Sequence, residues 1–231
     1  MARELLYDAA SLAALAAPFR AMLVNSATGY KPANLLGTRG PDGTLNLAIL
    51  SSVVHVGSDP ALVGCIFRPP VPREHGSHTF HNARETGEFT ISHVSTAWYR
   101  KAHATSARYA DGTSEFEAVG LTPWYFPAGS DGPFGAPAVA ESPVRLALRW
   151  EDHWAIPANG CTFVVGRVVG LSVPADAVAA DGALDVVGLE TAAISGLDGY
   201  HGGTRLERLA YAKPDRPSTG TTDFLAGFPR D

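Results

Sequence analysis

ANLLGTRGPDGTLNLAILSSVVHVGSDPALVGCIFRPPVPREHGSHTFHNARETGEF, residues 33–89, is the stretch that decides the fold. Two apolar runs in it, Leu35–Thr38 and Leu45–Leu50, flank Pro41-Asp42-Gly43. An Asp-Gly pair between apolar runs is a strong signal for a β-hairpin. Leu62–Phe67 is a continuous apolar run of strand length, which predicts a third strand buried on both faces.

A short helix is predicted next. Ser77 is placed to cap a helix from about His78 to Thr86, and Gly87 supplies the left-handed residue that commonly follows a helix end. Beyond it, the run Phe89–Val94 alternates apolar and polar residues, as a half-buried strand does.

The chain before this stretch predicts a helix over residues 8–24. It opens near Asp8, and Pro18 should kink or divide it because proline lacks the amide donor. Glu4 and Asp8 argue against a signal peptide, and no apolar run approaches the length of a membrane span. We therefore expect a cytoplasmic protein that is not embedded in a membrane.

The second half of the chain predicts one more helix and further strands. Trp98–Tyr109 is a plausible helix rich in Arg, Lys and His, whereas residues 110–143 lack a clear period and contain several prolines and aromatics. We interpret this irregular segment as a lid or a subunit contact. Strand signals return at Val144–Trp150 and Thr162–Val173, and two glycines in the second run suggest bulges.

Composition excludes some classes of protein. The 231 residues include 45% hydrophobic residues, enough to bury a core, and the net charge is -5 from 18 basic and 23 acidic residues. No cluster of Lys and Arg interleaved with aromatics occurs, so the sequence predicts no nucleic-acid partner. Cys65 and Cys161 both lie in apolar runs, which is typical of buried free thiols in a reducing compartment.

Three kinds of chemistry find little support. His75, His78 and His81 recur at spacings of three, but these positions drift around a helix and would not converge on one metal ion. No G-x-S-x-G elbow of a hydrolase is present. No G-x-G-x-x-G lies between a strand and a helix, so a Rossmann-type dinucleotide site is not expected.

A site for a ligand phosphate is the remaining interpretation. The predicted helix start offers free backbone amides and a positive dipole end. Hydroxyl donors and a cation stand nearby: Ser51, Ser52, Ser77 and Thr79, with Arg68 or Arg84. The residues alone leave open whether these groups bind a phosphate or only cap the helix and close the strands.

A resemblance adds to this interpretation. The segments NLAILSSV, DPALVGCIFRP and HTFHNARETGEFTISHV, in this order, resemble the flavin reductase-like family, and the likeness continues in SEFEAVGLTP, AVAESPV, GLDGYH and LERLAYAKP. The resemblance implies a mainly β fold with peripheral helices, an FMN-binding split β-barrel over residues 30–214. Residues 1–29 would then be a lead-in helix and residues 215–231 a tail.

The family pattern also implies a homodimer with one FMN per subunit near the interface. By resemblance, the isoalloxazine ring would lie beside Asn46, Leu47 and Ala48. Ribityl and phosphate contacts would come from Ser51, Ser52, Arg68, Thr79 and Asn82, with Ser77 and His78 as weaker candidates. The turn at Gly196–His201 could reach the flavin of a neighbouring subunit.

The resemblance implies an NAD(P)H-dependent flavin reductase that moves hydride between nicotinamide and flavin, acting with a small-molecule substrate. This chemistry needs no protein nucleophile, and the sequence names no catalytic acid or base. Two alternatives remain: an FMN-binding electron carrier or flavoprotein acting on a specific small molecule without nicotinamide, and a dimeric split barrel with another ligand.

Overall fold

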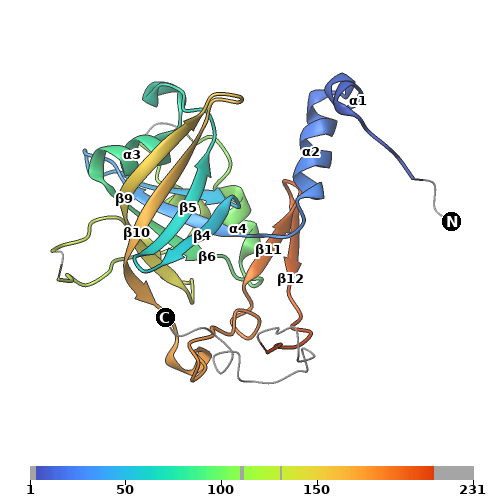
Figure 1. Ribbon diagram of the computed structural model, residues 1–231. Helices are drawn as coiled ribbons and strands as arrows, with labels where there is room; N and C mark the ends of the chain where they lie inside the picture. Colours follow the sequence, from blue (N-terminus) through green and yellow to red (C-terminus); the bar gives the residue numbers. More distant parts are fainter. Residues whose placement is uncertain (1–3, 110–111, 131, 211–231) are drawn as a thin grey trace.

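The computed structural model describes residues 4–109, 112–130 and 132–210 of the chain. Its main unit is an antiparallel seven-stranded sheet with the order β3-β2-β6-β9-β10-β5-β4. These strands are β2 (Asn34–Arg39), β3 (Leu45–Leu50), β4 (Val53–Ser58), β5 (Ala61–Phe67), β6 (Glu88–His93), β9 (Arg145–Ile156) and β10 (Cys161–Ser172). The sheet curls into a split barrel whose edge strands are β3 and β4 (Figure 1).

The predicted hairpin is confirmed. β2 and β3 pair in antiparallel register from Arg39 opposite Leu45 to Asn34 opposite Leu50. In the turn, the Gly43 amide donates to the Gly40 carbonyl at 2.9 Å, and Gly43 has a φ of 90° that suits glycine. The edge strands are consecutive in the chain, so only residues 51 and 52 cross the open side of the barrel.

The prediction for Leu62–Phe67 is correct in type, but its burial is less complete than expected. The first residues of β5 are exposed or half-buried, because β5 pairs with the edge strand β4, which we did not predict. β4 itself is mostly exposed. β5 and β4 are joined by a tight turn at Asp59-Pro60.

Helix α3 (His78–Thr86) has the predicted bounds, and Gly87 ends it with a φ of 72°. The predicted side-chain cap by Ser77 is wrong. Ser77 has a φ of 58°, and its hydroxyl accepts from the Val71 amide at 3.1 Å, so it bonds the loop before the helix. The β6 strand is buried along most of its length, more than predicted, because β2 and β9 flank it in the middle of the sheet.

The strand predicted at Val144–Trp150 is longer than expected, whereas the strand predicted at Thr162–Val173 has the expected length and begins one residue earlier. They extend as a hairpin from Arg145 to Ser172, and their register shifts between Val165 and Gly166 and between Val168 and Gly170. The two glycines therefore mark bulges, as the sequence indicated.

The helix expected over residues 98–109 is shorter, α4 (Tyr99–Ala104). The Thr105 and Ser106 hydroxyls donate to the carbonyls of Ala102 and His103 at 2.8 and 2.7 Å. These local bonds satisfy the last carbonyls of the helix with side chains and compete with its continuation.

The segment expected to be irregular contains regular elements: α5 (Glu115–Val119), β7 (Pro123–Trp124) and β8 (Ala138–Val139). α5 packs on β3, and β8 packs against β2, β6 and β9. The later part of this segment is therefore built into the barrel wall.

An N-terminal arm stands away from the barrel (Figure 1). It consists of α1 (Ala9–Ala14) and α2 (Ala17–Ala27), and Pro18 divides the two helices as predicted. Asp8 caps α1 by accepting from the Ser11 amide at 2.8 Å. The arm leads into a small sheet of β1 (Lys31–Pro32), β11 (Ala192–Ser195) and β12 (Gly199–Gly202), ordered β1-β11-β12.

The remaining elements are the short 3-10 helices η1 (Arg73–His75) and η2 (Ala175–Ala177). Within the described residues, no helix has the length and apolarity needed to cross a membrane. The tail predicted from residue 215 lies outside the described residues.

Two apolar clusters make up most of the core. One fills the barrel around Phe80, Phe89 and Val164. The other lies on the far side of β3, where Leu47 packs with Ala102 of α4 and Phe116 of α5. Side chains alternate along β3, so this edge strand separates the α3 side from the α4 and α5 side.

Candidate functional site

A cavity of about 1050 Å³ opens at the split of the barrel. Its wall is formed by β3 and the link to β4, the end of β5, the start of α3, the segment after α4 and the β11–β12 hairpin. Eight of the ten predicted contact residues lie on this wall: Asn46, Ala48, Ser51, Ser52, Arg68, Ser77, His78 and Thr79.

The other two predicted residues, Leu47 and Asn82, do not line the cavity. The Leu47 side chain is fully buried in the cluster behind β3. Asn82 is 3% exposed and accepts from Arg73 Nη1 at 2.7 Å while donating to Thr38 Oγ1 at 3.3 Å. Both residues support the wall from behind, and the period of 2 along β3 explains the placement of Leu47.

A polar network fixes the side of the cavity next to α3. Asn46 Nδ2 donates to Thr79 Oγ1 at 2.8 Å and to Thr38 Oγ1 at 3.2 Å. Thr38 also accepts from Asn82, so one buried hydroxyl joins two predicted residues. The network orients the first turn of α3 relative to β3.

The start of α3 collects donors suited to an anion. The His81 amide is the first in this region to form a helical hydrogen bond, which it donates to the Ser77 carbonyl. The preceding amides face the helix start, where the dipole is positive. Arg68, at the end of β5, is exposed on the same wall and forms no ion pair with any described residue. Arg84, the other cation that the sequence allowed, does not line the cavity.

Sequence reasoning did not name several wall residues on the α4 side: His103, Arg108, Tyr109 and Glu115. Arg, Lys and His are enriched in residues 98–109, which was the available signal for two of them. Glu115 lies in the SEFEAVGLTP motif, but its place on the wall depends on α5 packing against β3.

Tyr200 comes from the Gly196–His201 turn, which we expected to reach a neighbouring subunit. It lines the cavity of its own chain. Its hydroxyl is hydrogen-bonded to His103 Nδ1 at 3.1 Å, and its ring lies 5.1 Å from that of Tyr99. Burial, with a smaller contribution from Asp198, raises the pKa of Tyr200 to about 12. The phenol is therefore neutral near pH 7 and can donate a hydrogen bond.

The cysteines are free thiols in different environments. Cys65 is buried in β5, and burial raises its pKa to about 12, so it is an inert core group. Cys161 is half-buried on the cavity wall. In the described part of the chain, no group of three or more His, Cys, Asp or Glu side chains is arranged to hold a metal ion. His81, one of the three spaced histidines, bonds the Val71 carbonyl through Nε2 at 2.8 Å.

Comparisons with known proteins agree with this architecture. The family model for the flavin reductase like domain matches residues 30–187. No curated protein sequence gives a significant match. A solved structure from Shewanella frigidimarina, assigned as a flavin reductase with a split barrel domain, is 43% identical with a TM-score of 0.84, covering 90% of this chain and 100% of that chain.

Two more distant structures share the fold. Nitrilotriacetate monooxygenase component B from Bacillus cereus is 20% identical with a TM-score of 0.76, covering 90% of this chain and 100% of that one. Flavoredoxin of Desulfovibrio vulgaris is 22% identical with a TM-score of 0.63, covering 81% of this chain and 92% of that one. The family match spans most of the barrel and the cavity wall, and the chain belongs to the flavin reductase-like family.

Proposed function

We propose that this chain is an FMN-dependent oxidoreductase, most simply an NAD(P)H:flavin reductase. One observation carries the proposal. The cavity at the split of the barrel joins the positive start of α3 and the cation of Arg68 to the face of β3, within one wall. A phosphate-bearing ligand with a flat ring needs these two surfaces side by side.

The donor set fits FMN. Arg68 and the amides at the start of α3 are suited to the phosphate, with hydroxyls of Ser51, Ser52 and Thr79 as further donors. Asn46 and Ala48 on β3 line the same cavity, and the ring would lie beside them. The volume of about 1050 Å³ is at or above the upper end of small-ligand sites, which are roughly 300–1000 Å³.

Bound flavin supplies the acceptor for two electrons arriving as hydride from a nicotinamide. The protein's own residues would bind and orient the ring and leave one face open. Asn46 is held by Thr38 and Thr79, so its position on the wall is fixed before any ligand binds. No acid, base or nucleophile of the protein is required in this account.

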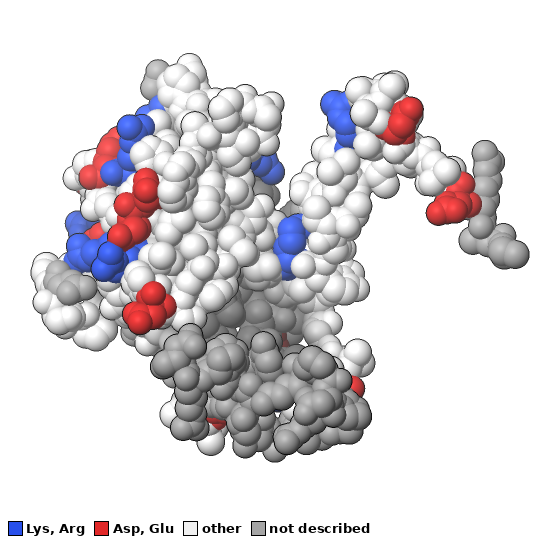
Figure 2. Space-filling model, in the orientation of Figure 1, with Lys and Arg blue, Asp and Glu red and all other residues white. Residues whose placement is uncertain are grey.

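We also propose a homodimer, because the arm leaves apolar side chains uncovered. Neither α1 nor α2 has a buried residue, and Phe19 and Val24 are 54% and 48% exposed. Val54 and Val56 on β4 are similarly exposed. Figure 2 shows that the face over β4 and β5 and the adjacent side of α2 are largely uncharged. A second copy of this chain is the occupant that would cover both surfaces.

The experiment that tests the function is anaerobic titration of the FMN-loaded protein with NADH and with NADPH, followed by absorption. Bleaching of the flavin bands by either nucleotide supports the reductase and names the donor. Flavin that binds but keeps its absorption bands with both nucleotides would favour an electron carrier. A protein that binds no FMN would contradict the proposal.

A further inference from the structure

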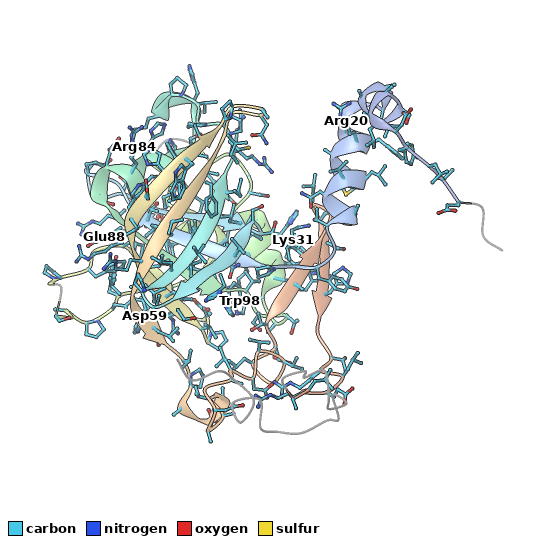
Figure 3. The ribbon with its side chains drawn as sticks, viewed as in Figure 1. Arg20, Lys31, Asp59, Arg84, Glu88 and Trp98 are labelled. Carbon is cyan, nitrogen blue, oxygen red and sulfur yellow. The ribbon has the colours of Figure 1, made fainter. Side chains whose placement is uncertain are left out.

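The cavity carries a second cation at its other end. Arg68 lies at the α3 side, whereas Arg108 follows α4. α3 packs into the cluster inside the barrel, and α4 packs into the cluster behind β3. Figure 3 labels Arg84 of α3 and Trp98, just before α4, and the two residues lie well apart in this view. The wall therefore has two basic ends divided by β3.

Arg108 has no anionic partner in the part of the chain that the structure describes. Among the described residues on the cavity wall, Glu115 is the one carboxylate. It forms no ion pair with Arg108, and Oε2 accepts from the Leu47 amide at 2.9 Å. An exposed guanidinium in the wall of a cavity, in a chain of net charge -5, is thus available to an incoming anion.

The segment that presents Arg108 is anchored. Hydroxyls of Thr105, Ser106 and Tyr109 donate to the carbonyls at the end of α4, at 2.8, 2.7 and 3.0 Å. These bonds satisfy the carbonyl groups at the negative end of the helix dipole, which would otherwise repel an anion. His103 also lines the cavity, and its Nδ1 is hydrogen-bonded to the Tyr200 hydroxyl.

We propose that Arg108, with His103 on the same cavity wall, binds the anionic group of the second ligand, the molecule that reacts at the flavin face. The proposal rests on the proposed function, in which FMN phosphate occupies the Arg68 end. This second ligand is an organic molecule that carries a phosphate or a carboxylate. A guanidinium forms paired, charge-assisted hydrogen bonds to either group. The cavity has the volume for a flavin and part of another molecule.

The test is calorimetric titration of the full-length protein, with and without FMN, using NAD⁺ as the phosphate probe and benzoate as the carboxylate probe. Arg108→Ala should weaken binding of at least one probe by about tenfold or more, the value of a lost charge-assisted hydrogen bond. Arg108→Lys should recover part of the loss. Arg84→Ala, an exposed arginine off the cavity wall, should bind both probes as the wild type does.

The FMN affinity separates the two claims. Arg108→Ala should keep the wild-type affinity for FMN, whereas Arg68→Ala should lose it. A loss of FMN binding in Arg108→Ala would overturn the inference by placing the flavin phosphate at the α4 end. Unchanged binding of both probes, or no binding of either to the wild type, would also overturn it. Failure of the wild type to bind FMN would instead contradict the proposed function.

Discussion

The Glu115 carboxylate on α5 accepts a hydrogen bond from the Leu47 amide on β3, with 2.9 Å between Oε2 and nitrogen. β3 is an edge strand, so this amide has no neighbouring strand to bond, and Leu47 is fully buried. The carboxylate supplies the hydrogen-bond acceptor that a neighbouring strand would otherwise supply. It also fixes α5 against the strand that forms one wall of the cavity.

Removing this carboxylate should destabilise the fold. We expect Glu115→Ala to lower the free energy of unfolding by about 1–3 kcal/mol, because a buried amide is left without an acceptor. Glu115→Gln retains an acceptor oxygen and should lose less. Glu117→Ala, an exposed acidic neighbour on the same helix, is the control, measured by urea unfolding. Equal stability of the Glu115 and Glu117 alanine variants would contradict this role.

Gly37 allows residues 136–139 to pack against the barrel. A Cβ at this position would lie 1.8 Å from the Pro137 carbonyl oxygen and 2.7 Å from Thr90 Oγ1, which donates to that same oxygen at 2.6 Å. Gly37→Ala should therefore cost about 1–3 kcal/mol or more in thermal or urea unfolding. Gly129→Ala, where a Cβ meets open space, is the matched control. A stable Gly37→Ala variant would show that this contact can relax.

His93 should make the protein sensitive to acid. Its Nδ1 is enclosed and has no partner among the described residues, and burial lowers its pKa from 6.5 to about 4. At pH values between these two pKa values, His93 binds a proton in the unfolded chain but not in the folded chain. Stability should thus fall as pH drops from 6.5 toward 4, by at most about 1.4 kcal/mol per pH unit for one proton.

The measurement for His93 is urea unfolding at pH 7.5 and pH 5. His93→Gln, which cannot titrate, should lose less stability between these values than the wild type. Other groups titrate identically in both proteins, so the comparison isolates His93. Parallel pH profiles for the two proteins would refute its contribution.

The arm should control the oligomeric state. Because the barrel of the same chain does not bury Phe19 or Val24, Phe19→Asp with Val24→Asp should leave the fold intact and shift a dimer to monomer. Light scattering coupled to gel filtration measures the mass, and Val178→Asp, an exposed apolar residue away from the arm, is the control. A wild type that is monomeric at all concentrations would contradict the proposed homodimer.

Much of the fold could be predicted from local patterns. The Asp-Gly turn, the apolar run of β5 and the glycine that ends α3 are signals within a few residues of the elements they define. Two errors have separate causes. Ser77 was assigned a cap from its position alone, but its backbone adopts the left-handed conformation and its hydroxyl bonds Val71. β4 was missed because an exposed edge strand lacks a clear alternation of apolar and polar residues.

The candidate site was predictable only where one segment supplies the residues. Ser51, Ser52 and Thr79 could be grouped because they lie at a strand end and at the start of a helix. Glu115 and Tyr200 reach the cavity from distant segments, through packing of α5 on β3 and of the β11–β12 hairpin beside α4. Both residues lie in segments that carry the family resemblance, SEFEAVGLTP and GLDGYH, but only the fold shows that they reach this cavity.

The most direct test of the account is the FMN affinity of Arg68→Ala/Thr79→Ala beside that of the wild type, followed by the absorption and fluorescence of bound flavin. Arg84→Ala is the control, because Arg84 lies on α3 but off the cavity wall. The account predicts that the double variant keeps the wild-type circular dichroism and binds FMN at least about tenfold more weakly, since it lacks a charge-assisted contact to phosphate. A double variant that binds FMN as tightly as the wild type would contradict it.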